Sequence, residues 1–169
     1  ILQNLNGKHT VCVNSGKAEM AGGLVQGKLN NSESGGGFYI NSGGTLDISG
    51  GYIAGSTGSN GGGIYTKGTV NMTGGVIAAN HANAGGGVYV DGGNVDISSG
   101  AVAGNWVNDG HNSGGGIYVS SGTLNLSDNG YVTNNYKNEC CTNDINNNHG
   151  GGGIALAGSS EMNMSGGYV

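Results

Sequence analysis

The chain has 169 residues, 40 glycines, no proline and a formal net charge of −5. This length fits one domain, and the absence of proline together with glycines that do not recur every third residue excludes a collagen triple helix. Charged residues make up only 9%, with five Lys plus Arg, which argues against nucleic acid or an anionic membrane as the main partner. No apolar run approaches the roughly 20 residues that a membrane-spanning helix needs, so we expect no membrane insertion. Because the chain starts at Ile1 and shows no signal peptide, we expect a processed chain or a segment of a longer one.

A glycine-led unit recurs along the chain. Five units open with three glycines, at residues 35, 61, 85, 114 and 151. A sixth unit near residue 8 lacks the glycines but aligns with the others through Val11-Cys12-Val13. Internal repeats of this length are typical of solenoids, propellers and arrays. We therefore interpret residues 1–169 as one solenoid domain.

Each unit holds three short segments in which apolar residues alternate with other residues. In the unit at residue 61 they are Ile64-Tyr65-Thr66, Val70-Asn71-Met72 and a segment centred on Ile77. A period of two is the strand period, and a helix would lose about 1 kcal/mol for each glycine relative to alanine. The sequence thus predicts an all-β fold: a right-handed parallel β-helix, or β-solenoid, of about six three-strand coils without caps. Equivalent strands would pair about 4.8 Å apart along the axis.

The segment after the third strand varies most between units. Asn80, Asn105 and Asn135 each follow the third-strand apolar residue by three positions. Asparagine suits such corners because its amide bonds to backbone and because it tolerates left-handed conformations. The insertion at 136–150 is the longest, and its polar composition predicts a loop that projects from one side of the solenoid.

The repeat resembles a known family. The GGGI start combined with a later hydrophobic-x-x-Asn element, as in Ile77-Ala78-Ala79-Asn80, resembles the GGA[ILV] and FxxN repeats of polymorphic outer-membrane proteins. It is also similar to the β-helix passengers of autotransporter adhesins. Two departures are that a third glycine replaces the alanine and that Ile or Val replaces the Phe. The resemblance implies an extracellular, surface-displayed and non-catalytic role.

Four tyrosines are expected to point outward from consecutive coils. They are Tyr39, Tyr65, Tyr89 and Tyr118. Such a row is either a binding or assembly face, which stacks on glycan rings or docks a neighbouring filament, or a ladder that stabilises the exposed strands by stacking on itself. The sequence leaves both interpretations open.

The second strand carries an outward row of acids and amides. Its members are Asp47, Asn71, Asp96, Asn125 and Asn163. General acid–base catalysis needs carboxylates close together, whereas Asp47 and Asp96 are expected roughly 10 Å apart with Asn71 between them, and we expect no Lys or Arg on these strands. We therefore predict that the protein is not an enzyme and that the alternation of Asp with Asn relieves like-charge repulsion.

Other candidate sites have weaker patterns. Acceptor patterns for N-glycosylation begin at four residues, Asn30, Asn71, Asn125 and Asn163. His81, His111 and His149 recur at the variable corner without the tight spacing of metal ligands. We predict no metal site and no cofactor.

Three cysteines cannot all pair within one chain. Cys12 lies on the first coil, and Cys140 and Cys141 lie after the fifth, an expected separation of about 19 Å that exceeds the reach of a disulfide. An intermolecular disulfide in an oxidising location, unpaired cysteines and a bond between the adjacent pair stay open.

The two ends of the solenoid predict how it assembles. Open ends of a solenoid need caps or partners. From Val169 of one copy to Val11 of a following copy is 11 positions, the same as from Ile53 to Ile64. We therefore predict a head-to-tail homopolymer joined through Ile1, Val11, Tyr168 and Val169.

The functional prediction follows from this assembly. We expect an extracellular structural solenoid that builds a fibre, sheath or surface layer. One alternative is an adhesin passenger that binds glycan or a host surface. Another is a β-helix enzyme that cleaves polysaccharide.

Overall fold

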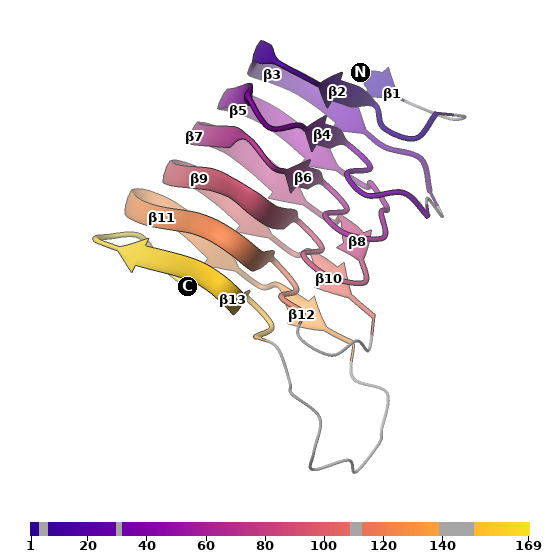
Figure 1. Cartoon of the computed structure of the whole chain (residues 1–169). Coiled ribbons are helices and arrows are strands. Elements are labelled where there is room, and N and C mark those ends of the chain that lie inside the picture. The colour runs from indigo at the N-terminus through magenta and orange to yellow at the C-terminus, as the bar shows by residue number, and fades with distance from the viewer. Residues whose placement is uncertain (4–6, 30–31, 109–112, 139–150) are drawn as a thin grey trace.

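The expected parallel β-solenoid is confirmed by a computed structural model of the chain (Figure 1). The structure describes residues 1–3, 7–29, 32–108, 113–138 and 151–169. Within these ranges the chain forms strands, turns and bends, and no helix. The strands stack in parallel along one axis, with the N-terminus and the C-terminus at opposite ends of the stack.

Each coil begins with a short strand and continues into a longer one. The first coils separate the two: β2 (Val11–Val13), β4 (Phe38–Ile40) and β6 (Ile64–Thr66) precede β3 (Gly16–Gln26), β5 (Gly44–Ala54) and β7 (Thr69–Ala78). In the later coils one strand spans both parts: β9 (Val88–Ala103), β11 (Ile117–Thr133) and β13 (Ile154–Met164). The long strands bend around the core, so each contains the predicted second segment and, except in β13, the predicted third (Figure 1).

The predicted register is confirmed through the first-strand row. Phe38 pairs with Ile64, Ile64 with Val88, Val88 with Ile117 and Ile117 with Ile154, all in parallel. The inward side chains of these rows form one narrow core, in which Ile40, Leu46 and Ile64 are fully buried. Burial of each such side chain stabilises the fold by roughly 1.5–3 kcal/mol.

An additional short strand follows each of the corner residues Asn80, Asn105 and Asn135, where the sequence indicated only a variable corner. β8 (His81–Ala82), β10 (Trp106–Val107) and β12 (Tyr136–Lys137) form a separate parallel sheet, and they line one side of the stack in Figure 1. Their side chains stack along the axis, with ring centroids 3.6 Å apart for His81 and Trp106 and 6.1 Å apart for Trp106 and Tyr136. These strands escape prediction because two residues are too few to show a period.

The corner asparagines form a ladder inside the solenoid. Asn105 Nδ2 donates hydrogen bonds to the carbonyl of Ile77 (2.8 Å) and to Oδ1 of Asn135 (3.0 Å). Asn105 Oδ1 accepts from the backbone N–H of Asn80 (3.1 Å). The expected backbone bonding is thus confirmed. The left-handed residue is a different one, however: Ala79 has φ 53°, and this turn points the following asparagine inward.

The two halves of the repeat signature meet in space. In the units at residues 61, 85 and 114 the third glycine lies beside a ladder asparagine. A Cβ at Gly63 would lie 3.0 Å from Nδ2 of Asn80, and a Cβ at Gly87 would lie 2.9 Å from Nδ2 of Asn105. Both distances are too short for a methyl group next to an amide held in place on several sides. The backbone carbonyl of the next coil is nearer still, 2.6 Å from a Cβ at Gly63 and 2.8 Å from one at Gly87. Together these contacts disfavour alanine at this position, where the repeats that the chain resembles have it.

Candidate functional site

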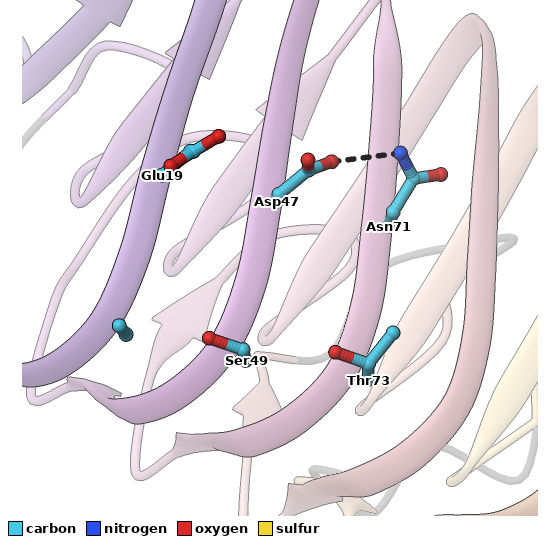
Figure 2. Close-up of a pocket in the computed structure, with 6 residues that line it drawn as sticks. Glu19, Asp47, Ser49, Asn71 and Thr73 are labelled. Carbon is cyan, nitrogen blue, oxygen red and sulfur yellow. Dashed lines mark hydrogen bonds between the residues drawn. The ribbon is translucent and has the colours of Figure 1, made fainter.

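The candidate site is a groove on the outer face of the second-strand segments (Figure 2). It has a volume of about 340 Å³. Two outward rows line it, one of Glu19, Asp47 and Asn71 and one of Ala21, Ser49 and Thr73. Strands β3, β5 and β7 each supply one residue to each row, because residues i and i+2 of a strand point to the same face. The rows run across the strands, parallel to the solenoid axis (Figure 2).

A lysine joins the two carboxylates at one end of the groove. Lys17 Nζ lies 2.6 Å from Asp47 Oδ2 and 2.8 Å from Glu19 Oε1. The expectation that no Lys or Arg lies on these strands is therefore wrong: Lys17 is the second residue of β3, and its side chain reaches across to the next coil. The hydrogen bond from Lys17, followed by one from Asn71, holds the pKa of Asp47 below its usual range. The same contacts, that with Asp47 foremost, raise the pKa of Lys17.

The acid and amide side chains of this face hydrogen-bond from coil to coil. Asn71 Nδ2 donates to Asp47 Oδ1 (2.8 Å), and Asn125 Nδ2 donates to Asp96 Oδ1 (2.5 Å). Asn163 Nδ2 continues the row by donating to Asn125 Oδ1 (3.1 Å). Asp47 and Asp96 therefore each have an amide donor on the following coil, which offsets the repulsion that stacked carboxylates would cause.

The groove offers hydrogen-bonding groups rather than a proton donor. A glycosidase of the usual kind needs one carboxyl group protonated at neutral pH and held near a second carboxylate. Here the neighbouring pair is Glu19 and Asp47, and the pKa of Asp47 is lowered, not raised. The six lining residues also include no aromatic side chain. The carboxylate, amide and hydroxyl groups of the lining can hydrogen-bond a polyol.

The four tyrosines expected to point outward stack on one another. Ring centroids are 4.9 Å apart for Tyr39 and Tyr65, 5.4 Å for Tyr65 and Tyr89, and 5.1 Å for Tyr89 and Tyr118. Tyr65 and Tyr118 are each only 8% exposed. Since the ring faces cover each other, this geometry favours the stabilising ladder over a face that stacks on glycan rings.

The ladder continues at one end and is anchored by a carboxylate. The His9 ring lies with its centroid 4.5 Å from that of Tyr39. The Tyr65 hydroxyl donates a hydrogen bond to Asp91, and burial followed by this bond raises the pKa of Tyr65 above its usual range. The Lys67 ammonium lies 3.5 Å from the same Asp91 carboxylate.

The weaker candidate sites divide between described and undescribed residues. Cys12 is exposed and forms no disulfide in the described part of the chain, where its Sγ lies 3.5 Å from Asn14 Oδ1. Cys140, Cys141, Asn30, His111 and His149 lie outside the described residues. Among the possible glycosylation sites that are described, Asn71 and Asn125 use their amides in the outer ladder, and Asn163 is exposed.

The corner histidine that is described belongs to a ring stack. Burial lowers the pKa of His81 against an opposing hydrogen bond with Asn108. Searching 1–3, 7–29, 32–108, 113–138 and 151–169 finds no group of three or more His, Cys, Asp or Glu placed to hold a metal ion. In the same ranges there is no helix able to span a bilayer.

At the N-terminal end of the stack, the strand pairing differs from that expected for the predicted head-to-tail junction. β1 (Leu2–Gln3) pairs in parallel with Val25 and Gln26. Leu2 therefore lies in the third-strand row, one level before Val25. At the other end Tyr168 pairs with Tyr131, so Val169 extends the same row. In the expected register, Val169 of a preceding copy would take the place that Leu2 occupies in this structure.

Comparisons of the chain with models of known protein families, with curated proteins and with solved structures gave no match.

Proposed function

We propose that this chain is a non-catalytic extracellular β-solenoid that stacks end to end into a fibre, sheath or surface layer. The observation that carries the proposal is a change of exposure at β13. Val119 and Leu126 are 0% and 1% exposed, but Leu156 and Met164, which pair with them, are 47% and 52% exposed. Core rows that are buried elsewhere thus reach an apolar surface at β13, whose outer edge pairs with no other strand of the described residues.

A further coil is the partner that suits this surface. Parallel strands already pair on one side of β13, and a strand edge with free N–H and C=O groups is a template for another strand. Burial of two aliphatic side chains would add roughly 1.5–3 kcal/mol each. We propose that the covering coil is the first coil of a second copy.

End-to-end stacking of two copies would have to displace the two-residue strand β1. Because Leu2 holds the place that the register assigns to Val169 of a preceding copy, Leu2 and Gln3 must leave Val25 and Gln26 when two copies join. Only two residues pair in β1, and Leu2 is 51% exposed, so their release costs little. Stacking then exchanges a two-residue strand for a full coil.

The resemblance to surface β-helix repeats supports the extracellular setting and the non-catalytic role. The lowered pKa of Asp47 and its bridge to Lys17 support the same role, since they keep the Asp47 carboxylate ionised and so unsuited to act as an acid catalyst.

A charged substitution at the open edge tests the proposal. We expect the wild-type chain to form rods whose length grows with concentration in sedimentation velocity and negative-stain microscopy. Leu156→Lys should stop this growth, because a lysine at a core row cannot be buried without a partner charge. Asn163→Lys adds the same charge on the outer face of β13 and should leave growth unchanged. A wild-type chain that stays one unit long up to its solubility limit contradicts the proposal, as does equal growth of the Leu156→Lys variant.

The groove favours a second candidate function, which is glycan binding by an adhesin. Carboxylate, amide and hydroxyl groups line it at a repeat of about 4.8 Å, close to the length of one sugar residue in an extended glycan. Filling it with Ser49→Trp should abolish saturable binding of a glycan panel. Tyr65→Ala with Tyr89→Ala should not, because the stacked rings offer no free face. Binding that survives Ser49→Trp and is lost in the tyrosine variant would assign the site to the tyrosine ladder.

A further inference from the structure

The third-strand segments present an outward row of residues. It is separate from the tyrosine ladder of the first strand and from the acid and amide row of the second. It contains Leu24, Tyr52, Val76, Ala101, Tyr131 and Tyr168, each paired with the next. A second outward row lies two residues further along each strand, at Ala54, Ala78, Ala103 and Thr133. We call these two rows the Tyr52 face.

The Tyr52 face is apolar and exposed. Tyr52, Tyr131 and Tyr168 are 57%, 41% and 60% exposed, whereas the intervening core residues Ile53 and Val132 are each 1% exposed. The exposed rings point to solvent because strand alternation allows no other direction once Ile53 and Val132 are buried. Tyr131 and Tyr168 stack on each other, with ring centroids 4.9 Å apart, yet both keep far more of their surface exposed than Tyr65 and Tyr118, which are each 8% exposed.

The Tyr52 face also lacks charge. None of its ten residues is Lys, Arg, Asp or Glu, although the chain carries 15 such residues (5 + 10). Two surfaces of this kind can meet without removing an ion from water, the step that makes charged interfaces costly. An uncharged surface rich in tyrosine is the composition typical of the centre of a protein interface.

We propose that a second copy of this chain docks side by side on the Tyr52 face. The first row favours a copy as the occupant, because the smaller residues Val76 and Ala101 lie between the larger Tyr52 and Tyr131. In an antiparallel pair related by a two-fold axis near Val76, Tyr52 of each copy lies over Ala101 of the other. Such an isologous contact uses one self-complementary patch twice.

The size of the face indicates how this contact works. Five levels at about 4.8 Å and a width of roughly 12 Å give on the order of 300 Å² for each copy, below the roughly 800 Å² for each partner in a stable complex. Single copies would therefore pair weakly. Rods of several stacked copies would pair firmly, because the contacts add along their length. This part of the inference rests on the proposed function. Among a fibre, a sheath and a surface layer, it favours a layer of adjacent rods.

The test uses a chain that does not stack, so that its result is independent of end-to-end growth. In a Leu156→Lys background, we expect concentration-dependent dimers in sedimentation velocity. After photo-oxidation, peptide mapping should find dityrosine cross-links between copies that involve Tyr52, since Tyr131 can also cross-link to Tyr168 of its own chain. Tyr52→Lys with Tyr131→Lys should raise the dimer dissociation constant tenfold or more, because two unpaired charges would be buried. Ser42→Lys with Ser159→Lys adds the same charge at exposed positions away from the face and should leave the constant unchanged.

The outcomes separate the two proposals. Without the Leu156→Lys change, loss of the Tyr52 face should give long single rods in place of sheets of rods, whereas failure of stacking gives no long rods at all. If the lysine pair disturbs folding, as circular dichroism would show, Tyr52→Ser with Tyr131→Ser takes its place with the same expected direction. A chain that stays monomeric in the Leu156→Lys background up to its solubility limit overturns the docking of a second copy. An unchanged dimer in both face variants overturns it equally.

Discussion

Two ladders of polar side chains run along this solenoid, one inside it and one outside. Both contain asparagine side chains whose amides donate hydrogen bonds from coil to coil. In the inner ladder Asn80 and Asn105 are 0% exposed, and each amide also holds a backbone carbonyl, at 2.8 Å from Ile53 or Ile77. In the outer ladder Asn71 and Asn125 bond to side chains only and remain partly exposed.

The difference shows that the stabilisation from an amide ladder depends on which polar groups would lack a hydrogen-bond partner if an amide were removed. Outside, water replaces a lost partner, and the net value of a hydrogen bond is about 0.5–1.5 kcal/mol. Inside, no water is at hand, and each unpaired buried group costs about 1–3 kcal/mol. The inner ladder therefore stabilises the fold, while the outer ladder is free to vary and to carry a binding function.

The largest effect is expected from removing the centre of the inner ladder. Asn105→Leu leaves the Ile77 carbonyl and the Asn80 N–H without partners, so we expect a loss of about 3 kcal/mol or more in the free energy of unfolding. Chemical denaturation measures this loss. Asn125→Leu, the same substitution in the outer ladder, is the matched control. Equal losses in the two variants would remove the distinction between the ladders.

A smaller effect is expected where the inner ladder ends. Ser56 replaces asparagine in this coil, and its Oγ accepts a buried hydrogen bond from the N–H of Gly27 at 2.8 Å. Ser56→Ala removes one acceptor and creates little space, so we expect a loss of about 1–2 kcal/mol. Thermal and denaturant unfolding should both show it. A neutral result would mean that Gly27 finds another acceptor.

Removal of one outer amide is expected to cost still less. Asn71→Ala breaks the bond to Asp47, which keeps Lys17 as a partner. The expected loss is about 0.5 kcal/mol. A loss above about 2 kcal/mol would show that the outer ladder is structural after all.

The smallest effect is a pH dependence. Because the pKa of Asp47 is lower in the folded state, with Lys17 as the first cause, its contribution is complete above the unfolded value of about 3.9. It is lost as pH falls below that value through the lowered pKa. At pH 7 the free energy of unfolding of the wild type should exceed that of Asp47→Asn by less than about 0.5 kcal/mol, since the pair is at the surface.

This difference should disappear in acid. Denaturant unfolding of both proteins at pH 7 and at about pH 2 measures it. In a Lys17→Met background the pH-dependent part should shrink. A difference that grows toward acid would reverse the sign of the linkage.

Much of the fold follows from local patterns, and the part that does not depends on contacts between coils. Phe38, Ile64 and Val88 alternate with outward residues, and this period was enough to predict their stacking. The strands β8, β10 and β12 are too short to show a period. They form because Asn80 and Asn105 turn inward and bring His81 and Trp106 side by side.

The candidate site was predictable only in part. Asp47 and Asn71 could be placed on one outward row, and Glu19 joins them by the same alignment. The contact of Lys17 with Asp47 could not be predicted, because a long flexible side chain can reach along its own strand or across to the next coil. For the tyrosines of the first strand, the sequence left both a binding face and a stabilising ladder open. Their mutual stacking, and the exposure of Tyr52 and Tyr131 instead, emerged only in three dimensions.

By itself, the sequence determined the parallel solenoid, its register and its inward rows, because a period of two within a repeat of fixed signature admits few other arrangements. Tertiary structure alone decided which outward rows are covered and which are free. Exposure of a side chain depends on its neighbours one coil away, some 24 to 37 residues distant in sequence (85−61 and 151−114). It also decided that the third glycine and the ladder asparagine act together, since Gly63 and Asn80 are in contact only when the coil closes.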